Sequence, residues 1–270
     1  MVDSLRQRVL TALLLAGLVV AALIGLPGDG AVAAIALVML AGAWEWAVFA
    51  GLTSTAGRVG YVALVAITIG VLWLASGDGA SLRAIMLATM LWWLAGLLWL
   101  VFASRRGGHV AAALAGLAVL APAAVGLARL VLIEPQGREM LLFLLVLTAA
   151  ADVGAFFGGR RFGRRKLAPV VSPGKTWEGL MSGMLAASLA AAVGALLLNQ
   201  PLLPWLGLCL VVALVSVVGD LVESMFKRRM GLKDSGTWLP GHGGVLDRID
   251  SLTAAAPAFV LGLVSFGWAA

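Results

Sequence analysis

Long apolar stretches recur along the whole chain, and they limit what it can fold into more than any other feature. As helices, stretches of about 18 residues or more can cross a hydrocarbon core of about 30 Å. Of the 270 residues 62% are hydrophobic and only 12% are charged, about half the usual charged share of roughly 25% in soluble domains. The stretches are rich in Ala, Leu and Val and do not alternate with polar residues. They therefore predict membrane-spanning helices rather than a soluble fold or a β-barrel.

The apolar stretches predict an all-α, polytopic membrane protein with about nine transmembrane helices. The first stretch resembles a signal peptide because Arg6 and Arg8 precede it, but its apolar run is longer than a typical signal core of roughly 7–15 residues. We therefore interpret it as a retained span. The expected spans lie near residues 9–26, 31–51, 60–77, 82–103, 111–133, 138–158, 179–198, 202–226 and 251–269.

Basic residues predict the orientation, because Lys and Arg collect in cytoplasmic loops. With a cytoplasmic N-terminus, all but three of the 19 Lys and Arg residues fall on the inner side, the exceptions being Arg83, Arg129 and Arg138. Nine spans then place the C-terminus outside. The net charge of +6 is explained by loops that face anionic lipids and substrates, so we expect no nucleic-acid partner.

The sequence divides into two parts by loop length. Residues 1–137 form N-terminal membrane helices with short connections, and residues 138–270 form C-terminal membrane helices with two long cytoplasmic loops, 159–178 and 227–250. We expect the catalytic or binding residues in the second part. The single cysteine, Cys209, excludes an internal disulfide.

Acidic residues within the spans are the first candidates for function, since a charge in a membrane is costly. Asp152 lies near the inner end of the sixth span, and Glu45 lies between two tryptophans of the second. Interfacial solvation or interhelical hydrogen bonds are the alternative explanation. For Glu45, pairing with a basic neighbour would suffice, so it is the weaker candidate.

The eighth and ninth spans carry ordered sets of polar residues. One face of the eighth span presents Asp220, Glu223, Ser224 and Lys227, at i, i+3, i+4 and i+7. Asp247, Asp250 and Ser251 begin the ninth span. Three helix ends thus present carboxylates at one membrane level, near basic residues. Carboxylates bind Mg²⁺ together with phosphate oxygens, and Lys and Arg neutralise phosphates, so this pattern indicates phosphoryl or nucleotidyl transfer.

The loop after the eighth span carries a specific motif over residues 224–250. It resembles the signature S-x-hydrophobic-K-R-x4-K-D-x-small-x2-L-P-x-H-G-G-hydrophobic-x-D-R-hydrophobic-D of phosphatidate cytidylyltransferases, also called CDP-diacylglycerol synthases. The fixed positions are met from Ser224, Lys227, Arg228, Lys233 and Asp234 to His242, Gly243, Gly244, Asp247, Arg248 and Asp250.

The other long loop carries a second resemblance to the same family. Residues 152–163 are similar to its D-x-x-A-Y-x-x-G-R-x-F-G segment, and residues 172–179 to its S-P-K-K-T-W-E-G segment. Two positions depart from the pattern, because Phe156 stands where tyrosine is usual and Gly174 where lysine is usual.

The resemblance implies transfer of CMP from CTP to phosphatidate, giving CDP-diacylglycerol and pyrophosphate, in a bacterial inner membrane. It implies Mg²⁺ as the cofactor, held by Asp220 and Asp247, with Asp220, Lys227 and Asp247 as the catalytic residues. The expected substrate-binding residues are Ser172, Lys175, Thr176, Ser224, Arg228, Lys233, His242, Gly243, Gly244 and Arg248. The expected supporting residues, which orient these groups, are Asp152, Glu178, Glu223, Asp234 and Asp250.

A membrane transporter of an anionic solute is the alternative, since intramembrane acids and basic loops fit that class as well. Against it, the charges gather at one membrane face and the two halves show no repeat. The expected partners are CTP, phosphatidate and membrane lipids. The oligomeric state is left open, with a homodimer as one candidate.

Overall fold

The computed structural model describes residues 14, 17–104, 106–238 and 243–268. Within this part, eight helices are long and apolar enough to cross a membrane. Residues 17–25 are also helical and belong to the first expected span. The all-α, multi-pass class is confirmed. The eight helices are α2 (Gly28–Phe49), α3 (Thr55–Ala75), α4 (Gly79–Ala103), α5 (His109–Val131), α6 (Gly137–Phe162), α7 (Trp177–Leu197), α8 (Leu202–Arg229) and α9 (Leu246–Ser265).

The two long loops are shorter than predicted. Helix α6 continues to Phe162 and α8 to Arg229, while α9 already begins at Leu246. The expected bounds 159–178 and 227–250 follow the fall in hydropathy, whereas the helical backbone continues past that point into charged residues. Charged residues therefore lie on rigid helix ends rather than on flexible loops.

A small antiparallel sheet, which the sequence analysis did not predict, connects α6 to α7. Strand β1 (Lys166–Ala168) pairs with β2 (Ser172–Thr176), with Lys166 opposite Thr176 and Ala168 opposite Ser172. The hydroxyl of Thr176 accepts a hydrogen bond of 3.1 Å from the N–H of Gly179 and so caps α7. The cap joins the end of the sheet directly to the first turn of the helix.

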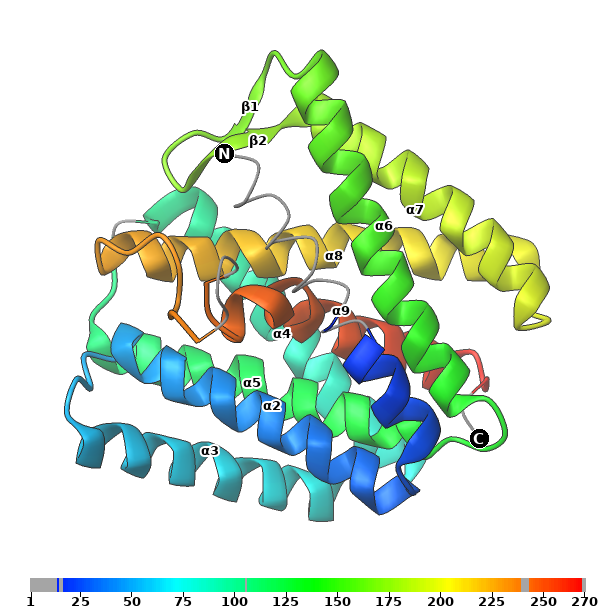
Figure 1. The fold of residues 1–270 in the computed structure, drawn as a ribbon, viewed down its shortest axis with the longest axis horizontal. Helices are drawn as coiled ribbons and strands as arrows, with labels where there is room; N and C mark the ends of the chain where they lie inside the picture. Colours follow the sequence, from blue (N-terminus) through cyan, green and yellow to red (C-terminus); the bar gives the residue numbers. More distant parts are fainter. Residues whose placement is uncertain (1–13, 15–16, 105, 239–242, 269–270) are drawn as a thin grey trace.

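The helices surround α8 and α9, which pack closely against each other (Figure 1). Helix α9 also contacts α5, α4 and α2 from the N-terminal part of the chain. Helices α6 and α7 form a hairpin at one edge, with β1 and β2 beyond their joined ends, and α3 lies at the opposite edge (Figure 1). Trp46, Trp205, Phe226 and Phe259 are fully buried between the helices.

Small residues bring α6 and α7 into close contact. A methyl group added at Gly154 would lie 2.6 Å from Cβ of Ala186, and one added at Gly183 would lie 2.6 Å from the carbonyl oxygen of Ala151. Close backbone approach of this kind stabilises helix pairs in membranes by van der Waals packing. The hairpin therefore holds β2 at a fixed position above α8.

Candidate active site

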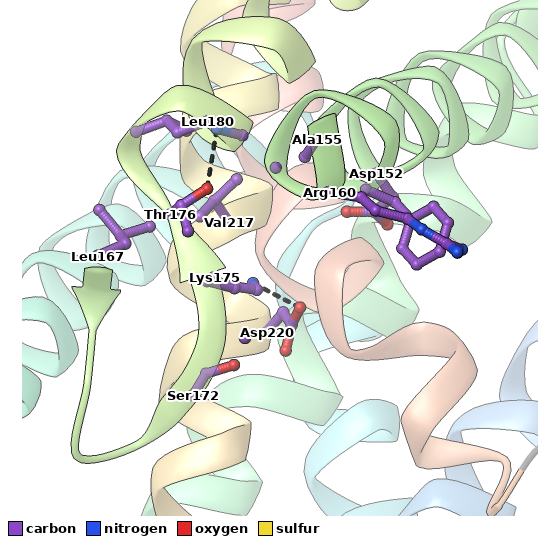
Figure 2. Close-up of a pocket in the computed structure, with 14 residues that line it drawn as sticks. Asp152, Ala155, Arg160, Leu167, Ser172, Lys175, Thr176, Leu180, Val217 and Asp220 are labelled. Atoms are coloured by element: carbon purple, nitrogen blue, oxygen red, sulfur yellow. Dashed lines mark hydrogen bonds and ion pairs between the residues drawn. The ribbon is translucent and has the colours of Figure 1, made fainter. Parts of the chain in front are cut away.

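A cavity of about 540 Å³ opens between α6, β2, α7 and α8. Leu167 on β1 also lines it, so four of the five lining elements come from one continuous segment, and α8 closes the remaining side. Figure 2 shows Lys175 on β2 pointing toward Asp220 on α8, with Asp152 and Arg160 on the opposite wall. The polar lining residues are Asp152, Arg160, Ser172, Lys175, Thr176 and Asp220.

Lys175 and Asp220 form the closest ion pair of the cavity. The ammonium nitrogen lies 2.5 Å from Oδ2 of Asp220, and both side chains are about a quarter exposed. Ser224, one helical turn further along α8, donates a hydrogen bond of 3.2 Å to Oδ1 of the same carboxylate. The Asp220 carboxylate is thus open to the cavity and already paired with a cation.

Two further carboxylates lie within electrostatic reach of Asp220. Asp152 on α6 and Asp250 on α9 each interact with Asp220 and with each other. Arg248 and Ser251, at the start of α9, interact with Asp152. The structure therefore brings together the three helix ends that the sequence predicted, and basic residues offset much of their negative charge.

Lys227 lies in a separate, buried group beside the cavity. Its ammonium nitrogen is 2.7 Å from Oδ1 of Asp247 and 3.0 Å from Oε1 of Glu223. The side chains of Lys227, Glu223 and Asp247 are 8%, 3% and 7% exposed. None of the three lines the cavity. They join the end of α8 to the start of α9.

Both carboxylate oxygens of Asp247 are engaged by protein donors. Oδ1 faces Lys227, and Oδ2 accepts hydrogen bonds from the N–H groups of Ser235 (2.9 Å) and Gly244 (2.8 Å). The Ser235 hydroxyl also lies 2.9 Å from Oδ2. Asp247 thus closes the loop between α8 and α9 onto the first turn of α9.

Asp247 can close the loop in this way only because residues 243 and 244 are glycines. Gly243 has φ of +78°, a conformation that L side chains rarely adopt. A methyl group there would lie 2.5 Å from Oδ2 of Asp247, and one at Gly244 would collide with the carboxylate of Glu45.

Glu45 belongs to the same buried group, although the sequence analysis made it the weaker candidate, for which a basic neighbour would suffice as partner. It is 3% exposed. Its carboxylate accepts hydrogen bonds from the N–H groups of Val245 (3.0 Å) and Leu246 (2.8 Å), and the Ser235 hydroxyl lies 2.9 Å away. Its partners are therefore backbone donors at the N-terminus of α9, together with Ser235, which the sequence analysis missed. In the sequence, the only sign of this structural role is an acidic residue within an apolar span.

The remaining predicted residues have different surroundings. Arg228 donates from Nε to the carbonyl of Val171 (3.2 Å) and from Nη1 to that of Leu232 (3.0 Å), which connects α8 to the β1–β2 turn. Lys233 and Asp234 are exposed. The prediction for His242 lies outside the described residues.

Glu178 faces away from the cavity. Its carboxylate accepts hydrogen bonds from the N–H groups of Arg164 (2.9 Å) and Arg165 (3.1 Å). It therefore supports the connection between α6 and β1 rather than the cavity itself.

The donor set of the cavity fits Mg²⁺. Mg²⁺ sites for phosphate substrates commonly use one or two carboxylates, several waters and the phosphates themselves. Asp152 and Asp220 line the same cavity, and Asp220 already accepts a cation. Among the residues described, no group of three or more His, Cys, Asp or Glu side chains could hold a metal without the substrate.

The fold and the cavity define a polytopic helical membrane protein with a polar cavity, in which carboxylates face lysine, arginine and hydroxyl groups. Residues 6–266 match the model of the cytidylyltransferase family, and the chain belongs to that family. Membership identifies it as a nucleotidyltransferase rather than the transporter considered as the alternative.

Two curated relatives agree over nearly the full length, and a third agrees over about half of the chain. A phosphatidate cytidylyltransferase of Pseudomonas aeruginosa is 46% identical over 98% of this chain and 99% of its own. One of Haemophilus influenzae is 36% identical over 94% of this chain and 97% of its own. A third, of Brucella suis, is 46% identical over 47% of this chain and 48% of its own. The family resemblance noted in the sequence is thereby confirmed.

Proposed function

We propose that this enzyme transfers CMP from CTP to phosphatidate, with Mg²⁺, at the cytoplasmic face of a bacterial inner membrane. The observation that carries the proposal is the Lys175–Asp220 pair, which faces the cavity between α6, β2, α7 and α8. The names of the full-length relatives support phosphatidate as the acceptor.

In the proposed reaction, an oxygen of the lipid phosphate attacks the α-phosphorus of CTP. A new phosphorus–oxygen bond forms, the bond between the α-phosphorus and the bridging oxygen breaks, and pyrophosphate leaves with the bond electrons. A phosphate monoester is largely ionised near neutral pH because its second pKa is about 6. No general base is needed, and the work of the protein is positioning and charge stabilisation.

The cavity residues suit this work. Lys175 provides a positive charge to phosphate oxygens, and the Ser172 hydroxyl on the same strand adds a hydrogen-bond donor. Thr176 holds the strand against α7 through its cap. When bound, Mg²⁺ would neutralise triphosphate charge and polarise the reacting phosphate, and Asp220 with Asp152 would hold it.

Asp247 and Lys227 have a different part in this proposal. Both oxygens of Asp247 are engaged by protein donors, and the Lys227 ammonium is shared by two carboxylates. These contacts support positioning rather than direct binding of metal or phosphate. The two residues would fix α8 against α9, so that Asp220 and Asp250 keep their places.

The position of the cavity suits one lipid and one water-soluble substrate. Phe156 lines the cavity and is largely exposed, so an apolar wall lies beside the polar groups. A diacyl lipid can keep its tails in the bilayer while its phosphate reaches Lys175. CTP enters from the aqueous side, which the distribution of basic residues places in the cytoplasm.

The test is pyrophosphate release by purified protein in detergent, with CTP and phosphatidate, with and without Mg²⁺. We expect product only when all three are present, and a strong loss in Asp220→Asn. Release that is absent with all three components, or equal without phosphatidate, would contradict the proposal.

A further inference from the structure

A second open cavity of about 540 Å³ lies on another face of α7. It is lined by Arg164, Arg165, Trp177, Glu178 and Met181. None of these residues lines the catalytic cavity, so the two cavities are separate, and the proposed reaction assigns this one no task.

Glu178 fixes the backbone of the two arginines and leaves their side chains available. Its carboxylate accepts from both backbone N–H groups. Within the part of the chain that the structure describes, no hydrogen bond or ion pair joins either guanidinium to another residue. Both arginines are exposed. The cavity therefore presents two adjacent guanidinium groups, of which that of Arg165 also interacts electrostatically with the Glu178 carboxylate.

An apolar stripe runs from this cavity along α7. Trp177, Met181, Leu185 and Leu189 are spaced four residues apart and are all more than half exposed. Residues four apart lie on one face of a helix. The stripe begins at the second cavity and continues along α7, a helix of membrane length. The two guanidinium groups of the cavity therefore lie at one end of an apolar helix face.

We propose that this second cavity, with its stripe, binds an anionic phospholipid that is not the substrate. Guanidinium groups bind phosphate oxygens through paired, charge-assisted hydrogen bonds. Tryptophan favours the interface between headgroups and acyl chains. The acyl chains would lie along Met181, Leu185 and Leu189. A water-soluble phosphate would leave the stripe unused, and for this reason we assign the site to a lipid.

The bound lipid would also contact both ends of the segment that joins α6 to α7. Arg164 and Arg165 follow α6, whereas Trp177 and Met181 belong to α7. Between them, β2 carries Lys175 into the catalytic cavity. An occupied site would therefore restrain the strand that presents Lys175, while every contact to the lipid is made outside the catalytic cavity.

The test measures lipid retention by native mass spectrometry, without CTP or turnover, so it is independent of the proposed function. Phosphatidylglycerol and phosphatidylcholine are titrated against the wild type and R164Q/R165Q. Arg106→Gln is the matched control, because Arg106 is an exposed arginine after α4. We expect the double variant to lose about tenfold in phosphatidylglycerol affinity, as loss of a charge-assisted pair predicts, and R106Q to match the wild type.

Additional variants test the proposal even if the double variant folds poorly. The single variants R164Q and R165Q retain the backbone bonds to Glu178 and should each give a partial loss. Met181→Ser should weaken retention of both lipids. Equal wild-type affinity for the two lipids, an equal loss in R106Q, or equally tight binding of glycerol phosphate would overturn the proposal.

Discussion

The Glu45 carboxylate on α2 accepts a hydrogen bond of 2.8 Å from the N–H of Leu246, the first residue of α9. The two residues are 201 positions apart in the chain. A carboxylate at a helix N-terminus satisfies free backbone donors and interacts favourably with the helix dipole. Glu45 thus acts as the cap that α9 lacks from its own N-cap residue, Val245.

We expect Glu45→Gln to lower kcat by about ten- to a hundredfold, in keeping with about 1.5–3 kcal/mol for a hydrogen bond to a charged group. A glutamine amide can turn only one oxygen toward the three donors, so at least one of them loses its acceptor. KM for CTP should change less than kcat, because Glu45 does not line the cavity.

The matched control for Glu45 is Glu139→Gln, in the exposed first turn of α6. It should keep wild-type turnover. Thermal unfolding of both variants separates lost activity from lost folding. A Glu45→Gln enzyme with normal kcat would show that the cap is dispensable.

Lys227→Arg should strongly reduce turnover at saturating CTP, because it would disturb the contacts that hold α8 against α9. The pocket between Glu223 and Asp247 holds a compact ammonium at 3.0 and 2.7 Å, and the larger planar guanidinium cannot keep both contacts in place. A lysine that only anchored α8 at the membrane interface would tolerate arginine, so that explanation predicts no such loss. The measurement is steady-state kinetics, with Lys166→Arg, at the exposed first residue of strand β1, as the control.

Lys227→Ala should also be destabilised. Removing the ammonium leaves two buried carboxylates without their cation, a change that costs about 3–5 kcal/mol in comparable buried pairs. A fall in unfolding temperature, measured by differential scanning fluorimetry, checks this. Wild-type stability in Lys227→Ala would argue against a charged pair of carboxylates at this position.

Three aspartates should differ in their effect on Mg²⁺ dependence. Asp220→Asn and Asp152→Asn remove charges that line the cavity, so both should raise the Mg²⁺ concentration needed for half-maximal rate. Asp247→Asn should lower kcat without that shift, since its oxygens are engaged by protein donors. The measurement is a titration of activity with Mg²⁺. A large increase in the Mg²⁺ concentration needed by Asp247→Asn would indicate that Asp247 is a metal ligand.

Gly243→Ala should strongly impair activity, because the position combines φ of +78° with a close approach to Asp247. Gly207→Ala is the control, as an added methyl group there meets no atom within 4 Å. Both variants should insert into membranes normally. Equal turnover of the two would mean that the loop adapts without cost.

Alkaline phosphatase fusions test the orientation, which the structure leaves as a prediction. A fusion after residue 270 should be active, because nine spans place it outside. A fusion between β1 and β2, near residues 169–171, should be inactive. The opposite pattern would place the catalytic cavity on the outer face.

The sequence by itself determined the class of fold and much of the chemistry. Spans of membrane length follow from local composition, because the cost of exposing polar backbone to lipid leaves helices as the solution for apolar stretches. The polar faces of α8 and α9 follow from helical spacing. The motif over residues 224–250 led to the family, which the full-length comparisons confirm.

Only the tertiary structure decided which polar groups meet. Sequence spacing could not show that Lys175 pairs with Asp220, that Lys227 is shared by Glu223 and Asp247, or that Glu45 caps α9. Each of these contacts, apart from the one between Lys227 and Glu223, joins different elements, and their relative placement depends on how whole helices pack. Charge near a helix end is a local property, whereas the identity of its partner is set by the fold.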